Sequence, residues 1–325
     1  MSAPLPVGVI GVGALGRHHA RHLASFHGVN LVGIHDADAA RAEAVAAELG
    51  TRSFHDLDSL LRQVRAVTIA VPTSAHGAVG RRALEAGVPV LMEKPLARSL
   101  EEADQLVAAA EARGLQLQVG HIERFNRAIR AAQDHLGEVR YFESTRLAPF
   151  QLRGTDVPVV LDLMIHDLDL VLHLTGGAPV ADVRASGLAL LTPHLDMASA
   201  RVEFAGGAVA VVTSSRLARE RTRKLRMFQA NGYFSLDLAT GEGEFMRLRQ
   251  GWVPGTGSSV QEVVDQIPLA APPADALGLE LASFIQAVRG EQAAVVTGAE
   301  GRAALALALR VTEAVRPVPA TLPAA

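Results

Sequence analysis

The feature that most constrains the fold is a glycine-rich turn close to the start of the chain. A short β-branched run leads into Gly11-Val12-Gly13-Ala14-Leu15-Gly16, and Ala14–Phe26 is predicted to be a helix. In this strand–turn–helix setting Gly11 permits the tight turn, Gly13 lets backbone approach a pyrophosphate, and Gly16 lets the helix pack on the strand. The phosphates of a dinucleotide would then bind at the helix N-terminus. We interpret the segment as the opening of a dinucleotide-binding Rossmann domain.

The second predicted strand ends at an acidic residue. Leu31–His35 reads as the strand, and Asp36 follows it, 20 residues beyond Gly16. A carboxylate at this place accepts hydrogen bonds from the adenosine ribose hydroxyls and repels a 2′-phosphate. The sequence therefore predicts NAD as the cofactor in preference to NADP. A purely structural turn remains the alternative, and the combination of strand, glycines, helix, strand and acid argues against it.

Strand and helix signals alternate as far as Gly120 and then change character. This alternation predicts an α/β domain with a doubly wound parallel sheet covered by helices on both faces. Beyond Gly120, short alternating strands dominate residues 180–245, and they predict an α+β domain on a mostly antiparallel sheet. We expect two domains, 1–120 and 121–325. Further expected elements are strands 66–71, 88–92, 115–120 and 139–147, and helices 37–49, 74–86, 99–113, 125–136, 157–174, 277–289 and 299–315.

Composition excludes several classes of protein and site. The chain has no cysteine, so disulfides, thiolate zinc sites and thiol nucleophiles are excluded. Charged residues make up 20% and the net charge is −3, which argues against a disordered tail or a general nucleic-acid binder. No basic segment precedes an apolar stretch at the N-terminus, and no apolar run approaches the roughly 20 residues that span a bilayer. We expect a cytoplasmic protein without a nucleic-acid or membrane partner.

A second motif, Glu93-Lys94-Pro95, stands at the end of a predicted strand. Doubly wound sheets bind their ligands at the carboxyl ends of their strands. Proline stops the strand and permits a cis bond, which would aim Lys94 into the crevice. An ammonium there would hold a substrate hydroxyl and ease its deprotonation as hydride leaves. The alternative is an ordinary strand end with an exposed salt bridge.

The helix expected at 157–174 carries a polar stripe. Asp162, His166, Asp169 and His173 fall at i, i+4, i+7 and i+11, which places all four on one face of a regular helix. Four ionisable groups on an otherwise apolar helix are costly to bury without a purpose. Two other interpretations stay open. The stripe would suit a metal ion, since His and Asp at this spacing are metal ligands, or it would be a solvated polar face.

Together these motifs and Val71-Pro72-Thr73 resemble the Gfo/Idh/MocA oxidoreductases, over nearly the whole chain. The resemblance implies an NAD-dependent dehydrogenase acting on CH–OH groups, with Lys94 as a catalytic residue and no metal. It implies that His166 accepts the proton of the reacting hydroxyl and that Asp162 positions the substrate or the imidazole. It also implies homodimers or homotetramers formed through the C-terminal sheet. Further residues that it places along the cofactor are Val71, Pro72, Thr73, His76, Glu93 and Lys94.

Three segments are similar to one branch of this family, the UDP-N-acetylglucosamine 3-dehydrogenases. They are His121–Asn126, Arg153–Asp156 and Leu161–Asp167. The similarity implies oxidation of a sugar-nucleotide 3-hydroxyl, and it makes Lys94, Asp162 and His166 substrate contacts as well. Guanidinium forks bind phosphate bidentately, and further candidate contacts to sugar or diphosphate are Arg124, Asn126 and Arg153. Val157-Pro158-Val159-Val160 departs from the glycine-rich run usual at this place.

Two other functions remain open. One is a dehydrogenase or reductase of a free sugar, inositol or another polyol. The other is a non-catalytic, dinucleotide-sensing Rossmann protein, against which the presence of Lys94, Asp162 and His166 together argues.

Two further polar clusters are expected to be structural. His18, His19 and His22 lie on the first helix with no acid nearby in the sequence, so we expect surface or packing roles. The basic run 216–226 alternates like an exposed strand at the edge of a sheet, where charge prevents aggregation. The alternative for this run is binding of an anionic substrate group or of another subunit.

Overall fold

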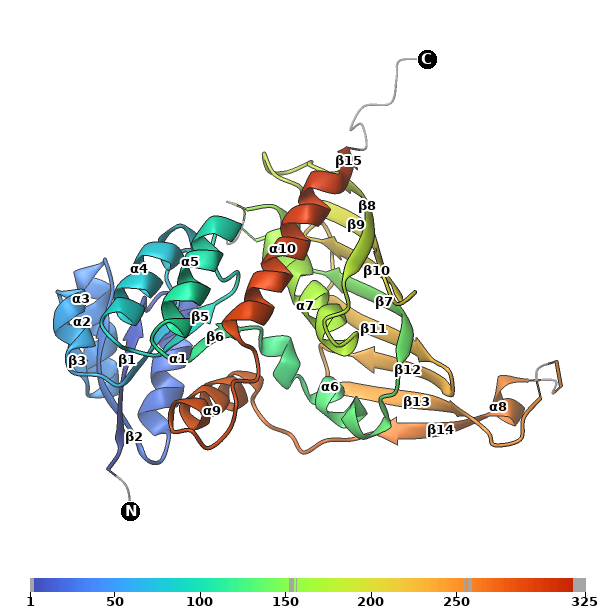
Figure 1. The fold of residues 1–325 in the computed structure, drawn as a ribbon, viewed down its shortest axis with the longest axis horizontal. Helices are drawn as coiled ribbons and strands as arrows, with labels where there is room; N and C mark the ends of the chain where they lie inside the picture. The colour runs from blue at the N-terminus through green and yellow to red at the C-terminus, as the bar shows by residue number, and fades with distance from the viewer. Residues whose placement is uncertain (1–2, 152–154, 156, 254, 257–258, 318–325) are drawn as a thin grey trace, which may run out of the picture. The chain divides into compact units, whose positions relative to one another are not determined.

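The computed structural model describes residues 3–151, 155, 157–253, 255–256 and 259–317. In it the chain divides into two compact units (Figure 1). Unit 1 comprises Met1–Ile122 and Asp275–Leu305, and unit 2 comprises Glu123–Ala274 and Ala306–Ala325. The sequence predicted a single boundary between residues 120 and 121. The structure adds that the chain comes back to unit 1 near its C-terminal end.

Unit 1 is built on a six-stranded parallel sheet with the order β3-β2-β1-β4-β5-β6. This is the strand order of doubly wound dinucleotide-binding folds, and it confirms the predicted fold class. The elements in chain order are β1 (Leu5–Ile10), α1 (Ala14–Ser25), β2 (Val29–His35), α2 (Ala39–Leu49), β3 (Arg52–Ser53), α3 (Leu57–Leu61), β4 (Ala66–Ile69), α4 (Thr73–Glu85), β5 (Val90–Glu93), α5 (Leu100–Glu111) and β6 (Leu117–Gly120).

The central strands of unit 1 are apolar because both faces of the sheet are covered. All four residues of β4, β5 and β6 are buried, which explains why these strands read as continuous apolar runs. Helix α9 (Ala276–Val288) joins this unit because its apolar side chains enter the same core as those of β1 and α1. The core members from α9 are Leu277, Leu281, Phe284 and Ile285. Burial of this apolar face accounts for the return of the chain.

Unit 2 is built on a nine-stranded sheet with the order β14-β13-β12-β11-β7-β10-β9-β8-β15. Among the strands that the structure describes, only the β7–β10 and β8–β15 pairs are parallel, so the predicted, mostly antiparallel sheet is confirmed. Its elements are 3-10 helix Ile122–Phe125, α6 (Arg127–Ala132), 3-10 helix Gln133–His135, β7 (Val139–Leu147), π-helix Val160–Met164, α7 (Ile165–Leu174), β8 (Val180–Leu188), β9 (Met197–Phe204), β10 (Val209–Ser215), β11 (Thr222–Gln229), β12 (Gly232–Asp237), β13 (Glu242–Leu248), α8 (Val260–Val263), β14 (Val264–Leu269) and β15 (Val315–Pro317). Helix α10 (Gly298–Ala314) belongs to unit 1 up to Leu305 and to unit 2 from Ala306.

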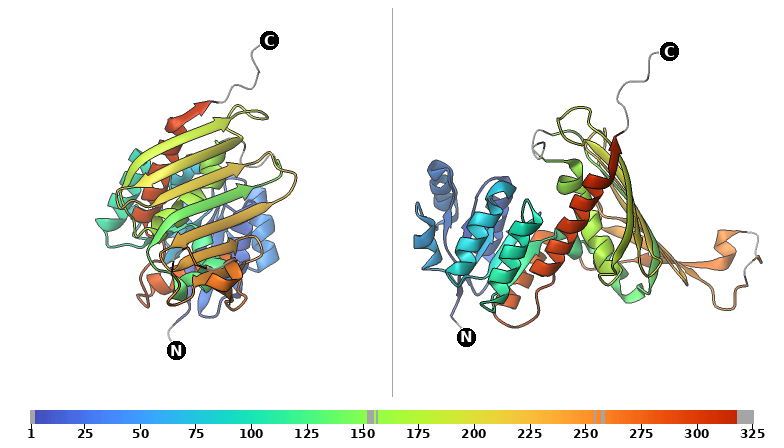
Figure 2. Two further views of the ribbon diagram at one scale, coloured as in Figure 1. Left: turned by 90° about the vertical axis from the view of Figure 1, so that its right-hand side faces the viewer. Right: turned by 45° about the horizontal axis from the view of Figure 1, so that its top comes forward.

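The two faces of this sheet have different roles. On β7, Phe142, Ser144 and Arg146 are buried on an inner face, and the residues between them are partly exposed on an outer face. Helix α7 packs against β7 and β10, while α6 packs against β12, β13 and β14. Figure 2 (left) shows the strands with the outer face toward the viewer. The inner face therefore carries the helix on which the polar residues Asp162 and His166 were expected.

One expectation about this half of the chain is confirmed with narrower bounds, and another is wrong. The helix expected near 125–136 is present as α6 with a final 3-10 turn, and it begins after Asn126, which caps α6 by accepting a hydrogen bond from Ala128 N. The basic run 216–226 does not form an edge strand, because β11 is bonded to β7 on one side and to β12 on the other. Alternation of polar and apolar residues predicts two faces, and it carries no information on how many neighbours a strand has.

Candidate active site

The glycine-rich turn has the geometry that a dinucleotide requires. Gly11 has a positive φ of 82°, and a Cβ added there would lie 2.8 Å from the backbone of Ala70. A Cβ on Gly16 would lie 1.8 Å from the carbonyl oxygen of Gly11, so only glycine lets α1 approach the turn. A Cβ on Gly13, the N-cap residue of α1, would meet nothing within 4 Å. The space beside Gly13 at this helix N-terminus suits a pyrophosphate, so these residues fit NAD.

Asp36 is fixed beside this turn. The Val12 N–H donates to Asp36 Oδ2 over 2.7 Å, and the Asp38 N–H donates to Oδ1 over 2.9 Å. Arg41 also lies 3.3 Å from Oδ1. A carboxylate has about four acceptor positions, so Asp36 keeps capacity for ribose hydroxyls. A neighbouring surface pocket of about 380 Å³ is lined by Val12, Gly13, Ala14, Arg17, Arg41, Ala44, Val45 and Glu48.

The arginines of that pocket are each matched by an acid. Arg17 forms an ion pair with Glu48, and Arg41 forms ion pairs with Asp36 and Asp38. Hydrogen bonds from arginine lower the pKa of Glu48, so it is charged at neutral pH. A 2′-phosphate would therefore meet carboxylates beside every guanidinium that lines this pocket. The arrangement agrees with the predicted preference for NAD.

Glu93 and Lys94 stand at the carboxyl end of β5, with a buried histidine behind them. His19 Nε2 lies 3.0 Å from Glu93 Oε1, and the Lys94 N–H donates to Glu93 Oε2 over 3.2 Å. Burial raises the pKa of Glu93, but the hydrogen bond and charge of His19 and the charge of Lys94 outweigh it, so the pKa lies below its usual range. The Lys94–Pro95 bond is cis. Sequence reasoning missed the His19–Glu93 pair because 74 positions separate the partners.

His76 joins two of the loops expected to line the cofactor. Its side chain is buried, with Nδ1 2.8 Å from the Pro95 carbonyl oxygen and Nε2 3.0 Å from that of Val71. Burial lowers the pKa of His76, although the two carbonyl contacts oppose the shift. His76 therefore ties the segment after β4 to the segment after β5. Pro72 precedes α4 as its N-cap residue, and Thr73 begins that helix.

The polar stripe of unit 2 is not on one regular helix. Residues Val160–Met164 form a π-helix in which both Leu161 N and Asp162 N contact the Pro158 carbonyl oxygen. Asp162 and His166 are partly exposed, Asp169 is buried, and His173 is exposed. The four residues thus occupy different environments, which corrects the expectation of a single stripe. A π-turn within a helix is frequent at functional sites, and here it carries Asp162 and precedes His166.

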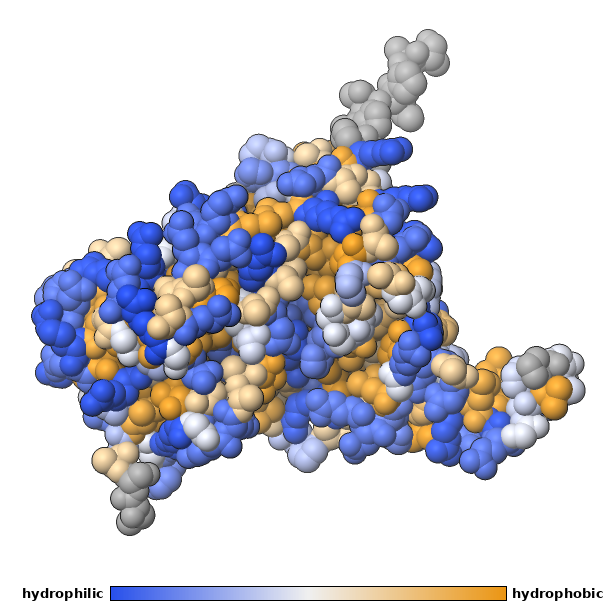
Figure 3. Space-filling view, viewed as in Figure 1, coloured by the Kyte–Doolittle hydropathy of each residue, from blue (hydrophilic) through white to orange (hydrophobic). Residues whose placement is uncertain are grey.

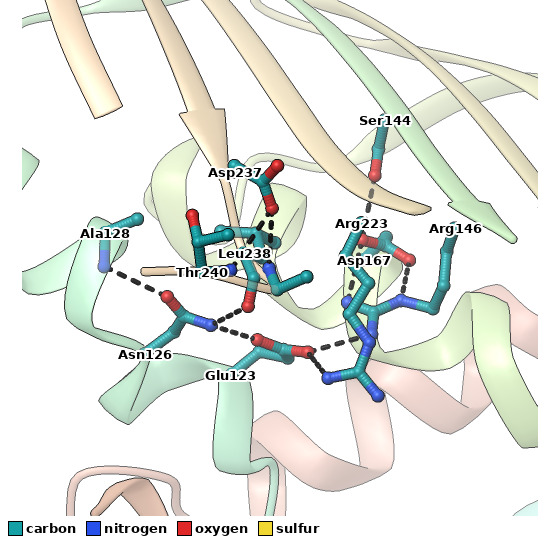
Figure 4. Close-up of polar contacts among 11 residues, drawn as sticks. Glu123, Asn126, Ala128, Ser144, Arg146, Asp167, Arg223, Asp237, Leu238 and Thr240 are labelled. Atoms are coloured by element: carbon teal, nitrogen blue, oxygen red, sulfur yellow. Dashed lines mark hydrogen bonds and ion pairs between the residues drawn. The ribbon is translucent and has the colours of Figure 1, made fainter. Parts of the chain in front are cut away.

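An ionic quartet with three buried members and one partly exposed member, Arg223, links α7 to the sheet (Figure 4). It comprises Glu123, Arg146, Asp167 and Arg223. Arg146 donates to Asp167 from Nε over 2.6 Å and from Nη2 over 3.1 Å, and to Glu123 Oε1 from Nη1 over 2.8 Å. Ser144 Oγ adds a hydrogen bond of 2.8 Å to Asp167 Oδ1. Burial alone would lower the pKa of Arg146, but Asp167 and Glu123 outweigh it and raise the pKa.

Two of the expected substrate contacts are engaged inside unit 2. Arg124 is buried, and its Nε and Nη2 donate to the two oxygens of Asp169 over 2.6 and 2.8 Å. Asn126 donates to Glu123 Oε2 and to the Leu238 carbonyl oxygen, both over 2.8 Å. Both side chains are therefore held by contacts within unit 2, and their expected contacts to sugar or diphosphate stay predictions. Arg153 lies outside the described residues.

Two features of the residues that the structure describes concern metals and membranes. No group of three or more His, Asp or Glu side chains among these residues is arranged to hold a metal ion. Within the same residues, no helix combines the length and apolar character that a membrane crossing requires.

Two family models match the chain. The one described as an oxidoreductase family with an NAD-binding Rossmann fold matches residues 5–121. The GFO/IDH/MocA C-terminal domain matches residues 127–235. The first match covers the glycine-rich turn and Lys94, and the second covers Asp162, His166 and most of the unit 2 sheet.

Individual relatives include dehydrogenases of sugars. A UDP-N-acetylglucosamine 3-dehydrogenase of Acidithiobacillus ferrooxidans is 44% identical over 309 residues, 95% of this chain and 96% of the relative. A solved structure of that enzyme superposes with a TM-score of 0.89, covering 97% of this chain and 98% of the other. The scyllo-inositol 2-dehydrogenase (NAD(+)) of Bacillus subtilis is 34% identical over 64% of this chain and 66% of its own. A structure of GenD2 from gentamicin A biosynthesis, in complex with NAD, shares the fold at 23% identity, with a TM-score of 0.78 and coverage of 97% and 94%.

Proposed function

The chain belongs to the Gfo/Idh/MocA family of NAD-dependent oxidoreductases, and on that premise we propose that it oxidises the 3-hydroxyl of UDP-N-acetylglucosamine to a ketone. The family makes it a dehydrogenase of CH–OH groups. The observation that carries the choice of substrate is the similarity to the Acidithiobacillus enzyme, which extends over 95% of this chain. The similarity to scyllo-inositol 2-dehydrogenase covers 64%.

We propose roles for three side chains in this reaction. When bound, NAD supplies the acceptor for the hydride that leaves the alcohol carbon. Lys94, partly exposed at the end of β5, holds the reacting hydroxyl and favours its deprotonation. His166 accepts the hydroxyl proton, which suits an imidazole whose unperturbed pKa is about 6.5. Asp162 positions the substrate or the imidazole.

The test is a substrate panel followed by NADH absorbance. We expect turnover of UDP-N-acetylglucosamine with NAD, and much slower turnover of UDP-glucose, myo-inositol and glucose. Turnover of inositol or glucose instead would keep the family and the mechanism and would discard the sugar nucleotide. If a protein that binds NADH forms no NADH with any substrate of the panel, the proposed substrate is contradicted.

The cofactor preference depends on Asp36. An Asp36→Asn variant keeps an acceptor for the Val12 N–H, removes the charge that repels a 2′-phosphate, and frees Arg41 to bind it. We expect the ratio of kcat/KM for NADP over NAD to rise about 10²-fold, since juxtaposed like charges cost several kcal/mol. Asp38→Asn is the control, because Asp38 contacts the same arginine but is the exposed N-cap residue of α2. An equal shift in both variants would deny Asp36 this role.

We also propose that the protein self-associates through unit 2. The outer face of its sheet carries Phe228 between Tyr141 and Tyr233, with ring centroids 5.9 and 5.4 Å apart, beside an ion pair of Arg226 with Glu143. The hairpin that carries α8 adds the exposed Val253 and Val260, and Figure 3 shows apolar side chains there. A patch that holds both an acid and its arginine partner is self-complementary, as two-fold interfaces require. A monomeric mass in light scattering would contradict this proposal.

A further inference from the structure

The inner face of the unit 2 sheet carries an unusual pair of like charges. Arg223 on β11 stands directly opposite Arg146 on β7 in the strand register, and both side chains belong to the ionic quartet. Two like charges directly opposite on one face of a sheet destabilise it. Such a pair persists only where acids compensate it or where one member has another use.

The acids of the quartet compensate Arg146 far better than they compensate Arg223. Arg146 makes three hydrogen bonds of 2.6–3.1 Å to Asp167 and Glu123. Arg223 reaches Glu123 Oε1 over 3.5 Å, and this is the same oxygen that Arg146 holds at 2.8 Å. Figure 4 shows both guanidiniums converging on that carboxylate. In the described part of the chain, Arg223 thus has one long, shared ion pair.

The electrostatic surroundings of Arg223 also favour the binding of an anion. Burial lowers its pKa, and the neighbouring Arg146 and Arg221 lower it further, although Glu123 and Asp167 oppose the shift. Arg219 and Arg221 are exposed just before β11 and add positive charge to the approach. An added anion at this guanidinium would relieve the repulsion and gain a charge-assisted hydrogen bond.

Arg223 is also accessible on the inner face. Helix α7 packs on β7 and β10, and α6 packs on β12, β13 and β14, so β11 lies between the strands that the two helices cover. The Arg223 side chain is 36% exposed, while those of Glu123 and Arg146 are 4% and 3% exposed. Its guanidinium is therefore the member of the quartet that a ligand can reach. It stands one strand from β7, to which the quartet ties α7, the helix that carries His166.

We infer that Arg223 is the binding group for the diphosphate of the nucleotide sugar. This inference rests on the proposed function, which supplies the substrate class. A guanidinium offers a planar fork that matches phosphate oxygens bidentately. The fork of Arg124, the diphosphate contact expected from the sequence, donates to both oxygens of Asp169, whereas Arg223 has, among the residues that the structure describes, only the long, shared contact to Glu123.

The test measures UDP binding by titration calorimetry, separately from turnover. We expect Arg223→Gln to weaken UDP binding about tenfold or more, since it removes a hydrogen-bonded charge. The KM for UDP-N-acetylglucosamine should rise in proportion, with kcat within about threefold of wild type. Arg223→Lys keeps the charge without the fork and should bind UDP with intermediate affinity. Lys224→Gln is the matched control: it removes one positive charge at the next, exposed position of β11, and it should bind like wild type.

The outcomes separate the inference from the proposed function. If the wild type oxidises UDP-N-acetylglucosamine and Arg223→Gln binds UDP like wild type, the inference is overturned and the function stands. If UDP binding depends on Arg223 but the sugar nucleotide is not oxidised, the anion site stands and the function falls. An equal loss of affinity in Lys224→Gln would overturn the inference, because the loss of any one positive charge on β11 would then explain the weaker UDP binding. If Arg223→Gln fails to fold, unchanged UDP affinity in Arg223→Lys overturns the inference.

Discussion

A Lys94→Met variant should lose on the order of 10³-fold in kcat and still bind NAD, because removing one preorganised donor to an oxygen that develops negative charge costs about 10²–10³-fold. Methionine keeps an unbranched apolar stem and removes the ammonium that we propose holds the reacting hydroxyl. The backbone at this position is fixed by the Lys94 N–H to Glu93 hydrogen bond, which the substitution leaves in place. Initial rates of NADH formation at saturating substrate measure kcat, and NADH fluorescence titration measures cofactor binding.

The chain offers a matched control, since Lys94 and Lys224 are its only lysines. Lys224 is exposed on β11, and Lys224→Met should leave kcat unchanged. Lys94→Arg tests whether a positive charge alone suffices: arginine keeps the charge, but its planar guanidinium presents donors in a different geometry from the ammonium. Wild-type activity in Lys94→Arg would reduce the role to electrostatics. A Lys94→Met enzyme within tenfold of wild type would remove Lys94 from the reaction.

The sequence predicts well those parts of the fold that depend on local residue patterns. The turn Gly11–Gly16 contains three glycines, and the structure shows why two of them, Gly11 and Gly16, tolerate no Cβ. The strand Val139–Leu147 was predicted with the bounds that the structure has, because its alternation reflects one buried and one exposed face. Strands β4 and β5 were also predicted, because all their residues are buried and each strand therefore appears in the sequence as a continuous apolar run.

The partners of buried charges were beyond sequence reasoning. Asp169 was expected on a polar stripe, but it pairs with Arg124, 45 positions away. The acid beside His19 is Glu93, and Asp167 pairs with Arg146 across 21 positions. Residue type shows that a charge needs compensation when buried, but the fold decides which charge supplies it. The π-turn at Val160–Met164 was missed for the same reason, since a regular helical period was assumed for the stripe.

The largest effect on stability should come from Arg146. An Arg146→Met variant leaves the carboxylates of Asp167 and Glu123 buried without their main partner, and removing one member of a buried ion pair costs about 3–5 kcal/mol. The methionine stem fills part of the space, so the loss comes mainly from uncompensated charge. Scanning calorimetry should show a lowered unfolding transition for unit 2. Excess NADH stabilises the cofactor-binding unit by binding to its folded form, so a transition that NADH leaves in place is assigned to unit 2.

Two further variants test whether the ion pair between Arg146 and Asp167 stabilises unit 2. Arg140→Met removes an exposed arginine from the same strand, and it should change stability by less than about 0.5 kcal/mol. Adding Asp167→Asn to Arg146→Met removes one of the stranded charges, so the double variant should be more stable than the sum of the single losses predicts. Strict additivity would mean that Asp167 and Arg146 do not interact in solution. Without that pairing, the polar link between β7 and Asp167 of α7 would be reduced to the hydrogen bond from Ser144 Oγ.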